Sequence, residues 1–192
     1  MQKLQKVQQN MKYKLNIGSG YKRIQGFLNL DSDKHCNPDY LVDLENAKFE
    51  FEDNSVDYIV AHHILEHVGE GFIPLLKEMY RVCDNNAIID IRVPHMNHDV
   101  AKIDPTHKRF LTVETFRLFS KKYNQEEIKR GGSSSTLGIM NDIDFEIIEN
   151  EYVLDGYYDS ILPILQPDVR ERLGREANNV CIEEHFRLRV VK

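Results

Sequence analysis

Short apolar runs, each followed by a polar turn, recur along this chain and predict its strands. Most of the runs are no longer than seven residues, which favours strands over helices. Turn-forming clusters such as Asp53-Asn54-Ser55 separate them. We expect strands at 14–17, 27–31, 40–44, 56–61, 87–93, 144–154 and 181–191.

Apolar residues three and four positions apart predict helices between some of these runs. The spacing is clearest from Phe72 to Cys83, after which the polar stretch 84–86 breaks the pattern. Thr112 can cap another helix that reaches about Tyr123. Weaker helical spacing occurs at 1–12 and 159–178.

Strands that alternate with longer connections predict an α/β protein with a mostly parallel, seven-stranded sheet. We expect a single domain over 1–192, with a helix or tail at 1–12 and a helical insertion at 155–179 before the last strand. The connections at 18–26 and 32–39 are shorter than the dozen or so residues of an ordinary parallel crossover. We therefore expect abbreviated helices after the first two strands, with loops and an outer sheet face left open there.

Composition narrows the classes of function. The net charge of -6 argues against nonspecific binding to nucleic acid or anionic lipid. No apolar run approaches the roughly 20 residues that span a bilayer, and the first residues lack a signal-peptide core. We expect a cytoplasmic protein that binds neither nucleic acid nor membrane. The three cysteines form no C-x-x-C pair, which disfavours disulfides and thiolate zinc sites.

A glycine-rich loop follows the first predicted strand. Gly18 and Gly20 allow positive φ and a close approach to a ligand. Arg23 stands where a dinucleotide fingerprint has its third glycine, which serves packing beneath a pyrophosphate. Asp31 follows Gly20 by only eleven residues, sooner than the twenty or so typical of nicotinamide sites. A nicotinamide-dependent oxidoreductase is therefore the weaker alternative.

Five stretches occur in order between residues 14 and 120. They read LNIGSG, GFLNLD, DLENAKFEFEDNSVDYIVAHHILEHV, LLKEMYRV and RVPHMNHDVAKIDPTHKRFLTVETFRLF. Together they resemble the class I S-adenosylmethionine-dependent methyltransferases, in particular the small bacterial and phage-type members (methyltransferase type 11-like) often found among surface-polysaccharide genes. The resemblance implies a Rossmann-like domain that binds S-adenosyl-L-methionine. That cofactor has no pyrophosphate, so the need for a third glycine relaxes.

The resemblance also implies roles for individual residues. Asp31 would accept hydrogen bonds from the ribose hydroxyls, Asp43 would accept from the adenine amine, and Leu44 would pack on the ring. Asn16 stands where most families have an acid, and its amide can orient the loop or reach the methionine ammonium through water. The implied cofactor-binding residues are Asn16, Gly18, Ser19, Gly20, Asp31, Asp43, Leu44, His62 and His63.

Six of the eight histidines fall between His62 and His107. His63 and His67 share a helical spacing, but no third ligand follows at a motif-like distance, so we expect no metal. A hydroxyl or amine acceptor loses a proton on methylation, and a histidine with a pKa near neutrality suits that task. We expect His95, just after the fifth strand, and His107, in DPTHKRF, to be the catalytic residues.

The sequence thus predicts a methyltransferase that acts on a small-molecule or glycan-type acceptor by in-line transfer, consistent with polysaccharide biosynthesis. The alternative is a non-catalytic relative that serves as a binding or assembly module. Asn16 and the short first crossover favour this alternative. Glu66 fits two roles equally well, as an acid favoured at a helix start or as a pocket residue.

Overall fold

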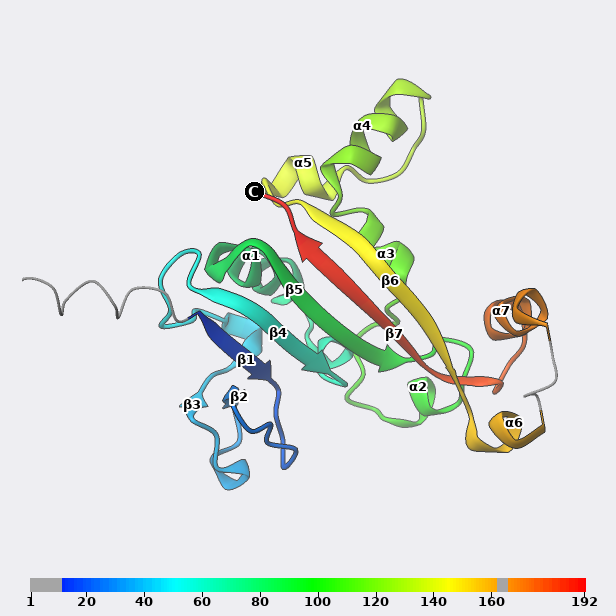
Figure 1. Ribbon diagram of the computed structural model, residues 1–192, viewed down its shortest axis with the longest axis horizontal. Coiled ribbons are helices and arrows are strands. Elements are labelled where there is room, and N and C mark those ends of the chain that lie inside the picture. Colours follow the sequence, from blue (N-terminus) through cyan, green and yellow to red (C-terminus); the bar gives the residue numbers. More distant parts are fainter. Residues whose placement is uncertain (1–11, 162–165) are drawn as a thin grey trace, which may run out of the picture.

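The computed structural model describes residues 12–161 and 166–192, and its strands form one sheet (Figure 1). The strand order is β3-β2-β1-β4-β5-β7-β6. The expected helix or tail at 1–12 lies, apart from Lys12, outside the described residues. The strands are β1 Tyr13–Ile17, β2 Leu28–Asp31, β3 Tyr40–Leu41, β4 Val56–His62, β5 Cys83–Pro94, β6 Phe145–Leu154 and β7 Cys181–Val190.

The sheet is mostly parallel, as predicted. β1 pairs in parallel with β2 and β4, while β2 pairs with β3 and β4 with β5 in the same sense. Only β7 is antiparallel, to β5 on one side and to β6 on the other. The predicted α/β class and seven-stranded sheet are therefore confirmed.

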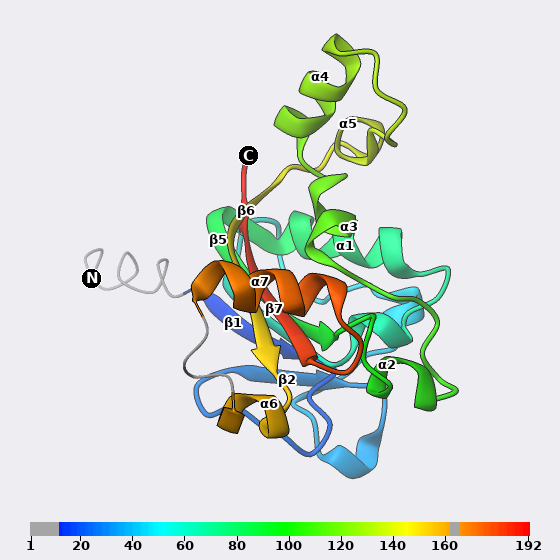
Figure 2. The ribbon, with the colours of Figure 1, turned by 90° about the vertical axis from the view of Figure 1, so that its right-hand side faces the viewer.

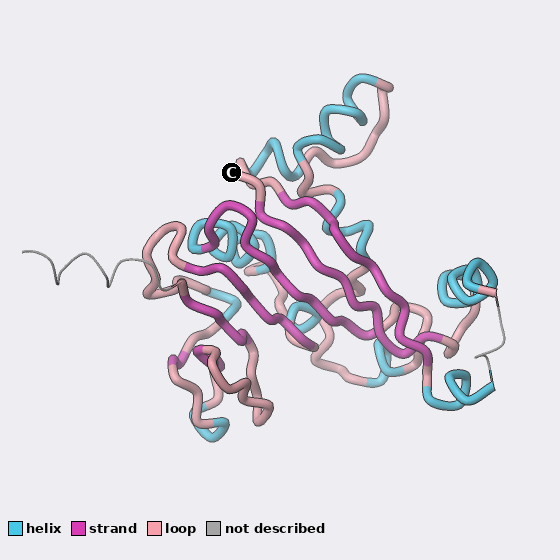
Figure 3. Tube along the Cα trace, viewed as in Figure 1, coloured by secondary structure: helices cyan, strands magenta, loops and turns pink. Residues whose placement is uncertain are grey.

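The connections after β1 and β2 contain no α-helix, because they are too short to hold one. β1 and β2 are joined by a loop, and β2 is followed only by the short 3-10 turn η1, Lys34–Cys36. Figure 3 shows that this end of the molecule is largely loop. The prediction of a strand over 40–44 was too long, because β3 ends at Leu41. Asp43 instead caps the 3-10 turn η2, Leu44–Asn46, by accepting a hydrogen bond from the Glu45 amide at 3.0 Å.

Helix α1, Phe72–Val82, covers one face of the sheet with the apolar side that its spacing predicts. It ends at Val82, and Cys83 already begins β5, so the polar residues 84–86 belong to a strand rather than to a helix end. The remaining helical elements are η3 Leu65–His67, α2 Val100–Ile103, α3 Val113–Arg117, α4 Lys121–Lys129, α5 Leu137–Asn141, α6 Gly156–Ile161 and α7 Pro167–Glu176.

The continuous helix predicted from Thr112 to about Tyr123 is wrong, because α3 and α4 are separate. The start of β6 breaks it, since the amide of Phe145 donates to the carbonyl of Phe119 at 3.1 Å. Asn124 donates to the neighbouring carbonyl of Leu118 at 2.9 Å. These carbonyls are thereby taken from the helical ladder, and the chain restarts at a new cap on Ser120.

The two faces of the sheet differ in character. Figure 2 shows α1 and α3 on one side of it, which we call the inner face. Alternation along β4 and β5 directs buried residues such as Ile59 and Ile89 to that face. Tyr58 and Asp90 point to the opposite, outer face, where they are hydrogen-bonded to each other at 3.0 Å. Within the described ranges, no helix is long and apolar enough to cross a bilayer.

Candidate functional site

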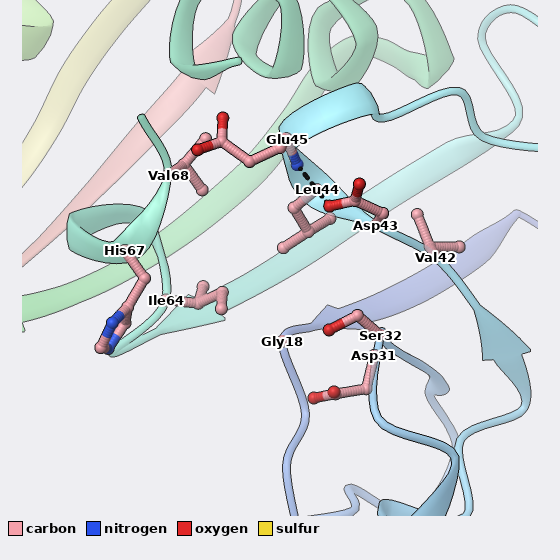
Figure 4. A pocket seen from close by; sticks show the side chains of 10 residues that line it. All are labelled: Gly18, Asp31, Ser32, Val42, Asp43, Leu44, Glu45, Ile64, His67 and Val68. Carbon is pink, nitrogen blue, oxygen red and sulfur yellow. Dashed lines mark hydrogen bonds between the residues drawn. The ribbon is translucent and has the colours of Figure 1, made fainter. Parts of the chain in front are cut away.

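A pocket lies at the carboxyl ends of β1 to β4 (Figure 4). Loops that follow neighbouring parallel strands meet at this edge, which is where open α/β sheets bind ligands. The residues that line the pocket are Gly18, Asp31, Ser32, Val42, Asp43, Leu44, Glu45, Ile64, His67 and Val68.

The glycine loop forms one wall of the pocket. Gly18 has φ +61°, and a Cβ atom there would lie 2.2 Å from Cγ1 of Ile64, so no larger residue fits without movement. Gly20 has φ +48° with open space around it. The Gly20 amide donates to Oδ2 of Asp31 at 2.7 Å, which ties the loop to the end of β2.

Asp31 is held in place yet keeps acceptor capacity. Its Oδ1 accepts from the Asp33 amide at 2.8 Å, and its Oδ2 accepts from Gly20. A carboxylate oxygen can accept two hydrogen bonds, so both oxygens retain a free site. Figure 4 shows the side chains of Asp31 and Ser32 directed into the space that Ile64 faces from the other side.

The opposite wall is apolar, with a polar rim. Leu44 is buried in the core, and Ile64 and Val68 stand across from it. Asp43 is exposed, and its Oδ2 accepts from the Asn46 amide group at 3.0 Å while Oδ1 caps η2. A flat ring with apolar faces and polar edges would fit between these side chains, with its edge toward Asp43.

Sequence reasoning assigned no role to several lining residues. Glu45 is the most notable of these, because its carboxylate accepts from the amides of Gly69 at 2.7 Å and Gly71 at 2.8 Å. It thereby joins η2 to the segment after β4 and closes one side of the pocket. The signal was present, since Glu45, Ile64 and Val68 all lie within the quoted stretch that begins DLENA.

Asn16 and Ser19 support the loop from below and do not line the pocket. The Asn16 side chain donates to the carbonyl of Lys22 at 3.0 Å and to Oδ1 of Asn29 at 2.9 Å. Ser19 is buried, and its amide donates to the carbonyl of Leu30 at 3.0 Å. The Asn16 side chain thus contacts the glycine loop at Lys22 and the strand beside it at Asn29.

His62 belongs to a buried polar cluster on the outer face. Its Nε2 lies 2.6 Å from Oδ1 of Asp90. The same oxygen accepts from His185, and Oδ2 accepts from Tyr58 and Arg187. Burial acts to raise the pKa of Asp90, but the hydrogen bonds from His62 and Arg187 outweigh it and hold that pKa well below its usual range. His62 therefore points away from the pocket.

The backbone conformation of His63 directs its side chain toward Glu183 and away from the pocket. It has φ +53°, and its Nε2 lies 2.6 Å from Oε2 of Glu183, which also pairs with Arg92 at 2.8 Å. The hydrogen bond to Glu183, with a smaller contribution from Glu66, raises the pKa of His63 to about 9. At neutral pH His63 is thus an imidazolium within an ion-pair group.

The two expected catalytic histidines lie in different surroundings. His95 is 3% exposed, its ring packs edge-on against Tyr152, and its Nδ1 accepts from the Asn97 amide at 3.4 Å. Burial lowers the pKa of His95, which keeps it neutral. The ring of His107, by contrast, lies 4.7 Å from that of His67, a pocket residue. Of the two expected catalytic histidines, His107 therefore lies at the edge of the pocket.

A comparison with protein families finds one match. Residues 20–90 match the family described as methyltransferase domain. A comparison with curated protein sequences finds no match.

Solved structures share the fold over nearly the whole chain. A S-adenosylmethionine-dependent methyltransferase from Archaeoglobus fulgidus is 14% identical, with a TM-score of 0.58 over 94% of this chain and 86% of that one. The YcgJ protein from Bacillus subtilis is 12% identical, with a TM-score of 0.57 over 95% and 93%. A S-adenosylmethionine-dependent methyltransferase from Mesorhizobium loti is 15% identical, with a TM-score of 0.51 over 94% and 91%.

Proposed function

We propose that the chain is a class I S-adenosylmethionine-dependent methyltransferase that methylates a small-molecule or carbohydrate-linked acceptor by in-line transfer, and the methyltransferase-domain match over residues 20–90 supports this proposal. One observation carries the proposal. The glycine loop, the acid that ends β2 and an apolar wall from two further loops converge on a single pocket at the carboxyl edge of the sheet.

The residues present fit S-adenosylmethionine, whose contribution is a methyl group made electrophilic by the sulfonium. Gly18 presents backbone without a Cβ, so a ligand can approach the loop closely. The free acceptor sites of Asp31 suit two ribose hydroxyls. Leu44 and Ile64 would hold the adenine ring between them, and Asp43 would accept from its amine.

The protein's part in the reaction is to position the acceptor and to take its proton. Alignment of the reacting atoms supplies much of the rate in such displacements. His107 donates through Nδ1 to the carbonyl of Ala101 at 2.9 Å, which leaves a lone pair on Nε2. We assign proton acceptance to that atom, and we give His95, enclosed beside Tyr152, a structural role.

The acceptor class rests on charge and on the loop after β4. A net charge of -6 disfavours a polyanion, and His62-His63-Ile64-Leu65 occupies the place of the Asn-Pro-Pro-Tyr-type loop of enzymes that methylate nucleic-acid amines. A glycan precursor in the cytoplasm fits these features. We further propose that residues 1–192 form one domain, in which the insertion at 155–179 carries α6 and α7.

Calorimetry with S-adenosylhomocysteine tests the cofactor pocket. We expect Asp31→Ala to weaken binding strongly, and Asp142→Asn, an exposed acid before β6, to leave it unchanged. No binding to the wild type at millimolar ligand would refute the assignment. A fluorescence titration with a reduced nicotinamide cofactor tests the oxidoreductase alternative.

Acceptor screening on nucleotide sugars and glycan precursors tests the substrate class. Methyl transfer to one of these compounds is the expected result. Cofactor binding without turnover on any acceptor would favour the binding-module alternative.

A further inference from the structure

A second cluster adjoins the cofactor pocket and is built from Glu66, His67 and His107. One donor atom from each residue lies within 4.8 Å of the others. Glu66 and His67 belong to η3, and His107 comes from the loop before α3. The Lys108 amide donates to the carbonyl of Glu66 at 2.8 Å, and Arg109 Nε donates to that of Val68 at 2.8 Å. These bonds clamp the His107 loop onto η3.

Glu66 is a buried carboxylate whose hydrogen-bonding capacity is unused among the described residues. It is 2% exposed, and neither carboxylate oxygen has a hydrogen-bond partner among the described residues. The closest charged group recorded for it is Nδ1 of His63, 3.7 Å from Oε1 and beyond hydrogen-bond distance. Buried carboxylates are normally paired, hydrogen-bonded or coordinated to a metal. Glu66 therefore has an ion-pair partner in His63 but no hydrogen bond among the described residues, which leaves its oxygens able to coordinate a further group.

Both imidazoles are oriented by hydrogen bonds at Nδ1. His107 Nδ1 donates to the Ala101 carbonyl at 2.9 Å. The Thr106 hydroxyl donates to Oδ1 of Asp104 at 2.6 Å, so its oxygen accepts from Nδ1 of His67 at 2.9 Å. Each ring consequently carries its proton on Nδ1 and a lone pair on Nε2, the arrangement in which outer hydrogen bonds prepare histidines to bind a metal.

The sequence spacing predicted no metal, but the fold brings His107 to Glu66 and His67, and we propose that these three residues bind a divalent first-row transition-metal ion at the edge of the cofactor pocket. Two imidazoles and a carboxylate suit Zn²⁺, Co²⁺, Mn²⁺ or Fe²⁺ better than Mg²⁺ or Ca²⁺, which prefer oxygen. Ligands of Zn²⁺ lie about 2.0–2.2 Å from the ion and so about 3.5 Å apart. The donors must close by roughly 1 Å on binding. Three protein ligands leave a coordination position open.

The role of the ion, unlike its binding, rests on the proposed function. His67 lines the cofactor pocket, and the role requires that the open position face the acceptor. A cation there holds an acceptor hydroxyl and lowers its pKa. The oxygen–methyl bond then forms as the sulfur–methyl bond breaks, and the hydroxyl proton passes to solvent. The Nε2 lone pair of His107 cannot both coordinate the ion and accept that proton. Methyl transfer that requires the metal would assign His107 the role of ligand, and transfer without metal would assign it the role of proton acceptor.

Titration of the metal-stripped full chain with Co²⁺, followed by visible absorption, tests the site directly. We expect saturation at one equivalent and displacement of Co²⁺ by Zn²⁺. His107→Ala and Glu66→Gln should abolish the Co²⁺ spectrum, while Thr106→Val, which only frees the His67 ring, should weaken binding by about 10- to 100-fold. His35→Ala is the matched control, because His35 also lies beside a carboxylate, 2.7 Å from Asp33.

Absence of Co²⁺ binding to the wild type, or a spectrum unchanged in His107→Ala, would overturn the site. Circular dichroism confirms that each variant is folded, and His107→Gln serves as a second variant should the alanine protein not fold. S-adenosylhomocysteine affinity is measured on the same samples. Metal binding without S-adenosylhomocysteine binding would support the site while refuting the proposed function. Methyl transfer that survives full removal of metal would refute the ion's role in the reaction.

Discussion

Alanine at Gly18 is expected to damage the protein much more than alanine at Gly20. Both glycines have positive φ, so each substitution carries the cost of a left-handed side chain, about 1–2 kcal/mol. At Gly18 the new Cβ would also lie 2.2 Å from Cγ1 of Ile64, whereas at Gly20 it meets nothing within 4 Å. Overpacking of this kind costs about 1–3 kcal/mol. We therefore expect losses of about 2–5 kcal/mol for Gly18→Ala and about 1–2 kcal/mol for Gly20→Ala.

Urea unfolding measures both losses, provided that the slope of the transition is unchanged. The collision with Ile64 is tested by a double-mutant cycle, in which Ile64→Ala should restore part of the stability lost in Gly18→Ala. S-adenosylhomocysteine affinity should fall further in Gly18→Ala than in Gly20→Ala, because Gly18 and Ile64 line the pocket together. Equal losses in the two alanine variants, or no coupling to Ile64, would refute this reasoning.

Two further predictions concern buried acids. Burial raises the pKa of Glu184 to about 7 from 4.5, so the folded state holds this proton more tightly and stability falls as pH rises from about 4.5 through 7. Glu184→Gln should remove that fall and be more stable than the wild type at pH 8 by on the order of 3 kcal/mol, because the pKa difference of about 2.5 corresponds to 1.36 kcal/mol for each unit. Urea unfolding from pH 5 to pH 8 measures this, and a stability curve of the variant that runs parallel to that of the wild type would contradict the prediction. Asp90→Asn should cost about 3 kcal/mol or more, because Asp90 accepts from four side chains at a buried site. Asp142→Asn, at an acid whose side chain is 93% exposed, should cost less than about 1 kcal/mol, and thermal unfolding that ranks the two variants alike would count against the buried cluster.

Local patterns were sufficient for much of the fold. Strand runs and the spacing of α1 reflect contacts between near neighbours, which the order of residues encodes directly. The short connections at 18–26 and 32–39 likewise predicted loops in place of crossover helices, because chain length limits what can fit. Where the prediction failed, a distant segment intervened: the Phe145 amide takes the carbonyl of Phe119 and divides the helix predicted from Thr112.

Part of the candidate site could likewise be predicted from the sequence, and part could not. Gly18, Asp31 and Leu44 could be found from the sequence because each lies at or just after the carboxyl end of a strand, and these ends meet at one edge of a parallel sheet. The directions of His62 and His63 could not, since alternation along β4 sends one to the outer face and a positive φ turns the other toward Glu183.

The sequence by itself therefore determined the parallel sheet, its pared-down first crossovers and the loops that end at the pocket. Only the tertiary structure decided which histidines lie together. His107 lies forty residues after His67 and reaches Glu66 because backbone hydrogen bonds from Lys108 and side-chain hydrogen bonds from Arg109 fold its loop onto η3. No local spacing encodes that contact, since it depends on the path of the whole chain between the two segments.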